Sequence, residues 1–134
     1  MSIRILLADD HTIVLQGLSR FLQTQEGLEI VGQAKDGQST VDLARELTPD
    51  VVVMDISMPG LNGIEASRLI HQENPNIKII GLSMHSSKRF VREMRDAGAS
   101  GYLLKDCDFD ELIEAIHTIA GGGAYFDPRI AEVA

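Results

Sequence analysis

The chain has 134 residues, enough for one domain that buries roughly two-thirds of its unfolded surface, so a second folding unit is not expected. Twenty acidic against twelve basic residues give a net charge of −8, which argues against direct nucleic-acid binding by this chain. No apolar stretch approaches the ~18 residues of a membrane span and no signal peptide is visible, so we expect a cytoplasmic protein without a membrane partner. The single cysteine, Cys107, is expected to be a packing residue.

Five apolar runs recur along the chain at similar intervals. They are IRILLA from Ile3, LEIVGQA from Leu28, VVVMDI from Val51, IKIIGLS from Ile77 and the weaker SGYLLK from Ser100. Most of them are apolar throughout instead of alternating, as strands that are covered on both faces require. Each run is therefore predicted to be a strand of a parallel sheet.

The stretches between the runs have the period of a helix. Apolar residues recur every three or four positions in residues 11–25, 88–99 and 109–122. Asn62 and Asp108 stand where helix N-caps are expected. This alternation of strand and helix predicts a single doubly wound α/β fold of the (βα)5 type, with helices on both faces of the sheet.

Polar residues close four of the apolar runs. Because the carboxyl ends of parallel strands meet at one edge of the sheet, we expect these residues to lie close together. Three carboxylates there would repel one another and raise their pKa values unless a cation joined them, and oxygen ligands favour Mg²⁺. A helix cap is an alternative for one acid but does not explain the whole set. The set is Asp9, Asp10, Asp55, Ser83 and Lys105.

Four stretches in this order form a specific pattern. They are the pair Asp9-Asp10, DISMPGLNGIE from Asp55, LSMH around Ser83, and GASGYLLKD, which ends at Asp106. Over nearly its whole length the sequence resembles the receiver domain of bacterial two-component response regulators. The segments ADDHTIVLQGL, MPGLNGIEA and HTIAGGGAYF most resemble the NarL/FixJ (LuxR-type) transcriptional regulators.

The resemblance implies a fold and a domain organisation. The fold is flavodoxin-like and CheY-like, with strand order 2-1-3-4-5. Residues 1–121 would form the receiver domain. Residues 122–134 would form a tail that begins the linker to a DNA-binding helix-turn-helix domain, which this chain lacks.

The resemblance also implies a phosphoacceptor and a metal site. Asp55 would accept a phosphoryl group from a phosphohistidine of a sensor histidine kinase. Asp10 and Asp55 would hold Mg²⁺ or Mn²⁺ directly, the backbone carbonyl of Ser57 would be a third ligand, and Asp9 would act through water. Lys105 would pair with a phosphoryl oxygen or, before transfer, with Asp55.

Further roles follow from the same resemblance. Ser83 would donate its hydroxyl to the phosphoryl group, and Tyr102 would be the aromatic residue that turns inward, with plain packing as the alternative. Ser57 and His85 would tune how quickly water removes the phosphoryl group, although a solvent-facing His85 is the simpler interpretation. Pro59 and Gly63 fit the family's loop after Asp55, where turn chemistry alone is a sufficient explanation. In one departure from the family, Asp106 stands where proline commonly follows the lysine. Because a non-proline cis bond is costly, the sequence does not decide between a cis and a trans peptide bond after Lys105. The other histidines are expected at the surface or on helix faces: His11, His71 and His117.

The implied function is that of a phosphorylation switch. It would control an appended transcriptional output domain, and only that domain would bind DNA. It would form a homodimer on phosphorylation. It would lose its phosphoryl group slowly and would not be a turnover enzyme. The alternatives are a stand-alone, phosphorylation-dependent protein-binding module, a degenerate receiver that only binds partners, and a Mg²⁺-dependent phosphatase that works through an aspartyl phosphate.

Overall fold

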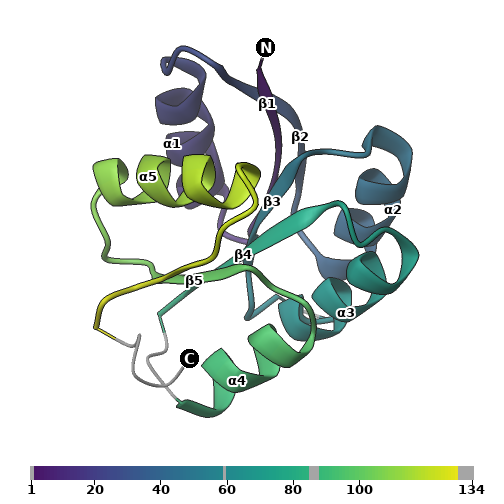
Figure 1. Ribbon diagram of the computed structural model, residues 1–134. Helices are drawn as coiled ribbons and strands as arrows, with labels where there is room; N and C mark the ends of the chain where they lie inside the picture. Colours follow the sequence, from purple (N-terminus) through teal and green to yellow (C-terminus); the bar gives the residue numbers. More distant parts are fainter. Residues whose placement is uncertain (1, 59, 85–87, 130–134) are drawn as a thin grey trace.

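The structure is a computed structural model that describes residues 2–58, 60–84 and 88–129. Within these residues there are five helices and six strands, in an order that largely alternates strand and helix (Figure 1). The strands are β1 (Ile3–Ala8), β2 (Leu28–Ala34), β3 (Val51–Asp55), β4 (Lys78–Ser83), β5 (Gly101–Leu104) and β6 (Tyr125–Phe126). The helices are α1 (Thr12–Gln23), α2 (Gly37–Leu47), α3 (Gly63–Glu73), α4 (Lys88–Asp96) and α5 (Phe109–Ala120).

All neighbouring strands of the sheet run parallel, in the order β2-β1-β3-β4-β5-β6. This confirms the predicted doubly wound fold and the predicted order of its first five strands. Helices α1 and α5 cover one face of the sheet, and α2, α3 and α4 cover the other (Figure 1). Strands β1, β3, β4 and β5 are therefore mostly buried on both faces, which explains why their sequences are largely apolar, whereas the edge strand β2 keeps exposed residues.

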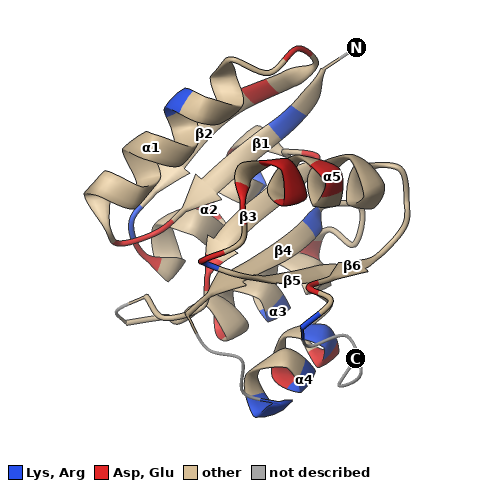
Figure 2. Cartoon of the chain, turned by 90° about the vertical axis from the view of Figure 1, so that its left-hand side faces the viewer, with Lys and Arg blue, Asp and Glu red and all other residues tan. Residues whose placement is uncertain are grey.

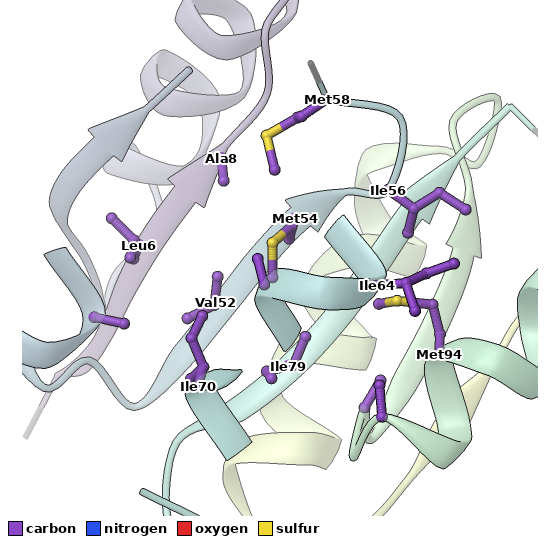
Figure 3. Packing of buried hydrophobic residues seen from close by; sticks show 14 of the residues in the cluster. Leu6, Ala8, Val52, Met54, Ile56, Met58, Ile64, Ile70, Ile79 and Met94 are labelled. Carbon is purple, nitrogen blue, oxygen red and sulfur yellow. The ribbon is translucent and has the colours of Figure 1, made fainter. Parts of the chain in front are cut away.

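Successive residues of each strand serve two separate cores. In β1, Leu7 packs with α1 and α5, while Leu6 packs with α2, α3 and α4. In β3, Val53 and Met54 divide in the same way. Figure 3 shows the second of these cores, where Met54 of the central strand lies among residues from α3 and the neighbouring strands. This two-residue period fixes the direction of every side chain up to the end of each strand.

Three helices begin at a side chain that accepts a hydrogen bond from the first turn. Asp36 accepts from the Ser39 N–H at 2.7 Å, Asn62 accepts from the Glu65 N–H at 2.9 Å, and Asp108 does the same for α5. The caps predicted at Asn62 and Asp108 are thus confirmed. They set where α3 and α5 start, and so fix the length of the loops that follow β3 and β5.

The sixth strand was not expected from the sequence, which suggests that the chain leaves the domain after Gly121. Instead Tyr125 and Phe126 pair with β5, at the yellow end of the ribbon in Figure 1. Tyr125 packs against the core under α1 and α5, and Phe126 packs against the core under α2, α3 and α4. Two residues give too short a pattern to be read as a strand, but two aromatic side chains that cover both faces of an edge explain why it forms.

Candidate metal and phosphoacceptor site

The register of the sheet brings the predicted site residues to one edge. Ala8 pairs with Met54, so Asp9 and Asp55 follow at neighbouring positions of β1 and β3. Ser83, the last residue of β4, pairs with Leu104, and Lys105 follows directly. Figure 2 shows acidic and basic segments meeting at this edge of a mostly uncharged sheet.

Lys105 joins two buried acids. Its Nζ lies 3.1 Å from Asp9 Oδ2 and 3.3 Å from Asp55 Oδ2. Both carboxylates are only 2% exposed and the lysine side chain is 11% exposed. Its backbone N–H donates to the Ser83 carbonyl at 2.8 Å, which ties the loop after β5 to the end of β4. The lysine was expected beside Asp55, and it also contacts Asp9.

One carboxylate oxygen from each of the three acids is buried and accepts no hydrogen bond of good geometry within the described part of the chain. These atoms are Asp9 Oδ2, Asp10 Oδ1 and Asp55 Oδ2. The acids offer ligand atoms that lie within 4.8 Å of one another. A buried anion without full compensation is costly, and oxygen donors at such separations suit a hard divalent cation. The residues present therefore fit Mg²⁺ or Mn²⁺.

The two adjacent acids differ in exposure. Asp9 is buried, and its Oδ1 accepts the His11 backbone N–H at 2.8 Å, whereas the Asp10 side chain is 30% exposed. Asp9 is thus fixed by a backbone donor and by Lys105. Asp10 lies nearer to solvent, on the side from which a hydrated cation would approach the acids.

The charges at this edge shift two pKa values. Burial raises the pKa of Asp55, and the charge of Asp9 raises it further, although the Ser57 N–H and Lys105 act in the opposite direction. Burial alone would lower the pKa of Lys105, but its contacts with Asp9 and the charge of Asp55 outweigh that effect and raise it. The ammonium is therefore firmly charged, while the Asp55 carboxylate is destabilised in the metal-free protein.

The loop after β3 holds Asp55 from its own backbone. The Ser57 N–H donates to Asp55 Oδ1 at 3.1 Å. Gly63 packs so closely beneath this loop that a Cβ there would lie 2.5 Å from both the Asp55 carbonyl oxygen and the Ile56 Cα. Glycine at this position is thus required by close approach of the helix to the loop, in addition to any role in the turn.

Ser83 and Tyr102 form a buried pair beside the acids. Both residues are fully buried, and the Tyr102 side chain hydrogen-bonds to Ser83. Burial raises the pKa of Tyr102, against the effect of that hydrogen bond. Tyr102 therefore points inward, toward the serine at the end of β4.

His11 is the site residue that the sequence interpretation missed. Its side chain is 61% exposed, as expected of a surface histidine, yet its Nδ1 lies 2.8 Å from Asp9 Oδ1 and 3.1 Å from Asp10 Oδ1. It joins the three acids as a fourth group able to hold a metal. Its place directly after Asp9 and Asp10, at the N-cap of α1, is a signal that could have been used.

Other predictions concern the neighbouring loops. His85 and Pro59 lie outside the described residues. Ser57 is exposed on the loop that follows β3. The described chain contains no cis peptide bond, so the bond between Lys105 and Asp106 is trans. No helix in the described ranges has both the length and the apolar character to cross a membrane.

Comparison with protein families gives one match that spans most of the chain. The model of the response regulator receiver domain matches residues 5–117. The transcriptional regulatory protein DegU of Brevibacillus brevis is 42% identical over 96% of this chain and 54% of its own length. The response regulator GacA of Pseudomonas aeruginosa is 41% identical over 97% of this chain and 61% of its own length. The chain thus spans little more than half the length of these curated relatives.

Solved structures agree with this match. A LuxR-family two-component response regulator from Aurantimonas sp. SI85-9A1 superposes with a TM-score of 0.94 at 41% identity, covering 98% of this chain and 94% of that one. The isolated receiver domain of RcsB from Salmonella enterica serovar Typhimurium, in the presence of the phosphomimetic BeF₃⁻, has a TM-score of 0.89 at 26% identity and 99% coverage of both chains.

Proposed function

The chain belongs to the response regulator receiver domain family, and from that premise we propose that Asp55 is its phosphoacceptor and that Mg²⁺ or Mn²⁺ is bound beside it. The observation that carries this proposal is the convergence of three buried, incompletely satisfied carboxylate oxygens, two of which lie beside Lys105. Such an arrangement holds unfavourable negative charge, which a bound cation would relieve at neutral pH without protonation of an acid.

Asp55 is the best placed of the three acids to react. It ends the central strand β3, and its Oδ2 has no well-aligned hydrogen-bond donor among the described residues. Asp9 has the same kind of contacts, a backbone N–H and Lys105, so the choice of Asp55 rests on its place at the end of β3 and on membership of the family. Asp10 and Asp55, with the backbone carbonyl of Ser57, would hold the ion, and Asp9 would act through water.

The bound ion would neutralise charge on the acids and on the oxygens of the transferring phosphoryl group. The residues of the chain do the rest. A carboxylate oxygen of Asp55 forms a bond to phosphorus as the bond from phosphorus to the donor imidazole breaks, and the imidazole nitrogen keeps the electron pair. Lys105 is positioned to move from Asp55 to a phosphoryl oxygen, and the Ser83 hydroxyl would donate to another.

The same contacts make a switch. When Ser83 donates to the phosphoryl group, its contact with Tyr102 has to be shared or exchanged. The inward position of Tyr102 is then one of two states whose populations phosphorylation shifts, and a few kcal/mol are sufficient for that. Ser57 and His85 remain proposed modulators of how long the phosphoryl group survives.

Partners follow from the relatives. Both curated relatives described above are named as regulators and are longer than this chain. We propose that the chain is cytoplasmic, that a sensor histidine kinase is its phosphoryl donor, and that it forms a homodimer on phosphorylation. The segment from residue 122 adds β6 to the sheet, and we propose that it then leads to a DNA-binding output domain. Response regulators are generally non-enzymatic, and we propose that this chain, too, accepts one phosphoryl group without sustained turnover.

Labelling with a small phosphodonor tests the proposal. Acetyl phosphate with Mg²⁺ should add one phosphoryl group per chain, stable in acid and labile in base, and the label should be lost in Asp55→Asn and in EDTA. Asp96→Asn, an exposed acid at the end of α4, serves as the matched control and should label normally. Continuous release of phosphate would favour a phosphatase, and absence of label in the unaltered chain would favour a binding module.

A further inference from the structure

The segment after α5 is tied to β5 by more than strand pairing. The Asp127 N–H donates to the Tyr102 carbonyl at 2.9 Å, so the edge strand runs past the switch tyrosine. The Tyr125 hydroxyl donates to the Glu111 carboxylate at 3.2 Å, which links the segment to α5 as well. Figure 1 shows this segment lying alongside β5 at the edge of the sheet.

Asp127 is an acid buried at the same edge as the proposed phosphoacceptor site, but on the far side of β5. Its side chain is 1% exposed, and its Oδ2 accepts from the Leu104 N–H at 3.4 Å. Leu104 is the residue immediately before Lys105. A charged group is buried here only because a cation and backbone donors compensate it.

Arg129 supplies that cation, and its guanidinium also reaches Asp106 in the loop after β5. Its guanidinium makes a two-point contact with Asp127, through Nε at 3.0 Å and Nη2 at 2.8 Å. Its third nitrogen, Nη1, lies 2.8 Å from Asp106 Oδ1. Planar two-point contacts of this kind fix orientation as well as charge. We call Asp106, Asp127 and Arg129 the C-terminal clasp.

We propose that Asp127 and Arg129 are positioning residues for Lys105, and that the C-terminal clasp couples occupancy of the Asp55 site to the segment from Tyr125 to Arg129 that pairs with β5. This inference rests on the proposed function of Asp55. The C-terminal clasp contacts the residues on both sides of Lys105: Asp127 accepts from the Leu104 N–H, and Arg129 pairs with Asp106. Any movement of Lys105 from the acids toward a phosphoryl oxygen therefore strains or shifts the clasp.

Coupling between two sites is reciprocal. If a phosphoryl mimic on Asp55 alters the clasp, loss of the clasp must alter the affinity for the mimic by the same factor. An ordinary surface ion pair would have no such effect. The exposed pair Arg45–Glu73, which joins α2 to α3 with two hydrogen bonds, offers the matched comparison.

The test measures the affinity of the whole chain for beryllofluoride in the presence of Mg²⁺, by isothermal titration calorimetry. Arg129→Ala should lower this affinity by about five-fold or more, the lower end of typical coupling. Asp106→Ala, which breaks only the contact with Arg129 Nη1, should have a smaller effect in the same direction. The double variant should match Arg129→Ala, because that substitution already removes the contact with Asp106. Arg129→Lys should restore part of the affinity, and Arg45→Ala should leave it unchanged.

A second readout separates positioning from folding. Hydrogen exchange of the amides of Leu104 and Asp127 should change when beryllofluoride binds the unaltered chain, and this change should disappear in Arg129→Ala. If the unaltered chain does not bind beryllofluoride, the proposed function fails. If it binds and the folded Arg129→Ala variant binds equally well with the same exchange response, the coupling is refuted and the proposed function stands.

Discussion

Replacing Asp55 with asparagine should stabilise the metal-free protein, although it removes the proposed reactive group. Ligand atoms of Asp9 and Asp10 lie within 4.8 Å of the Asp55 oxygen, so at an effective dielectric constant of about 20 each repels the Asp55 charge by at least about 3.5 kcal/mol. Lys105 at 3.3 Å attracts it by about 5 kcal/mol. Burial is the main effect that disfavours the Asp55 charge, and the two repulsions, less the one attraction, add about 2 kcal/mol to it.

After a discount for solvent screening at the rim, Asp55→Asn should gain about 1–2 kcal/mol in free energy of unfolding, which is about 4–7 °C in Tm for a chain of this length. Thermal unfolding followed by circular dichroism in EDTA at pH 7 measures it. With Mg²⁺ at about 100 times its Kd, the unaltered chain should gain about 2.7 kcal/mol and the variant clearly less. Glu46→Gln, at an exposed position on α2, controls for loss of one negative charge.

The Asp55 contribution to the stability of the metal-free protein depends on pH in a definite direction. Because burial raises the folded-state pKa of Asp55 above its unfolded value, the folded chain holds this proton over a higher pH range. Metal-free stability should therefore fall as pH rises from the ordinary carboxyl pKa through the raised one, and Asp55→Asn should lack this fall. The reasoning is refuted if the variant is less stable than the unaltered chain in EDTA.

Other predictions concern the surroundings of the site. Gly63→Ala would force a Cβ to within 2.5 Å of the Asp55 carbonyl oxygen, so it should cost about 1–3 kcal/mol in urea unfolding and slow phosphorylation; unchanged values would contradict the packing argument. Lys105→Met should raise the pKa of Asp55 further in a carbon-13 NMR titration without metal, and a lowered midpoint would count against the ion pair. The pKa of Asp127 is lowered mainly by its hydrogen bonds from Arg129. The stabilisation from this pair is therefore present above the ordinary carboxyl pKa and is lost as pH falls through the lowered pKa. Acid unfolding of Arg129→Ala should lack this loss of stability.

The sequence was sufficient for the strands and for the acids at their ends. The apolar run from Ile3 coincides with β1 at both ends, because a strand that is buried on both faces over most of its length leaves a nearly unbroken apolar pattern. Once the sheet is parallel, its register alone brings Asp9, Asp55 and Lys105 to one edge. Residues that terminate strands are thus predictable from pattern and topology together.

Contacts made by single side chains were not predictable in this way. Arg129 reaches Asp127 and Asp106 only because a two-residue strand returns the chain to β5 after α5, and two residues carry no periodic signal. His11 depends on a side-chain torsion at a helix cap, which no spacing rule specifies. Such positions follow from tertiary packing, which local pattern does not encode.

Site mapping tests the central claim most directly. The unaltered chain is phosphorylated with acetyl phosphate and Mg²⁺, reduced with borohydride so that an acyl phosphate becomes homoserine, and digested for mass spectrometry. Homoserine at position 55 and at no other acid is the predicted result. Homoserine at position 9 or 10, or a phosphorylated chain without homoserine, would contradict the assignment of Asp55 as the phosphoacceptor.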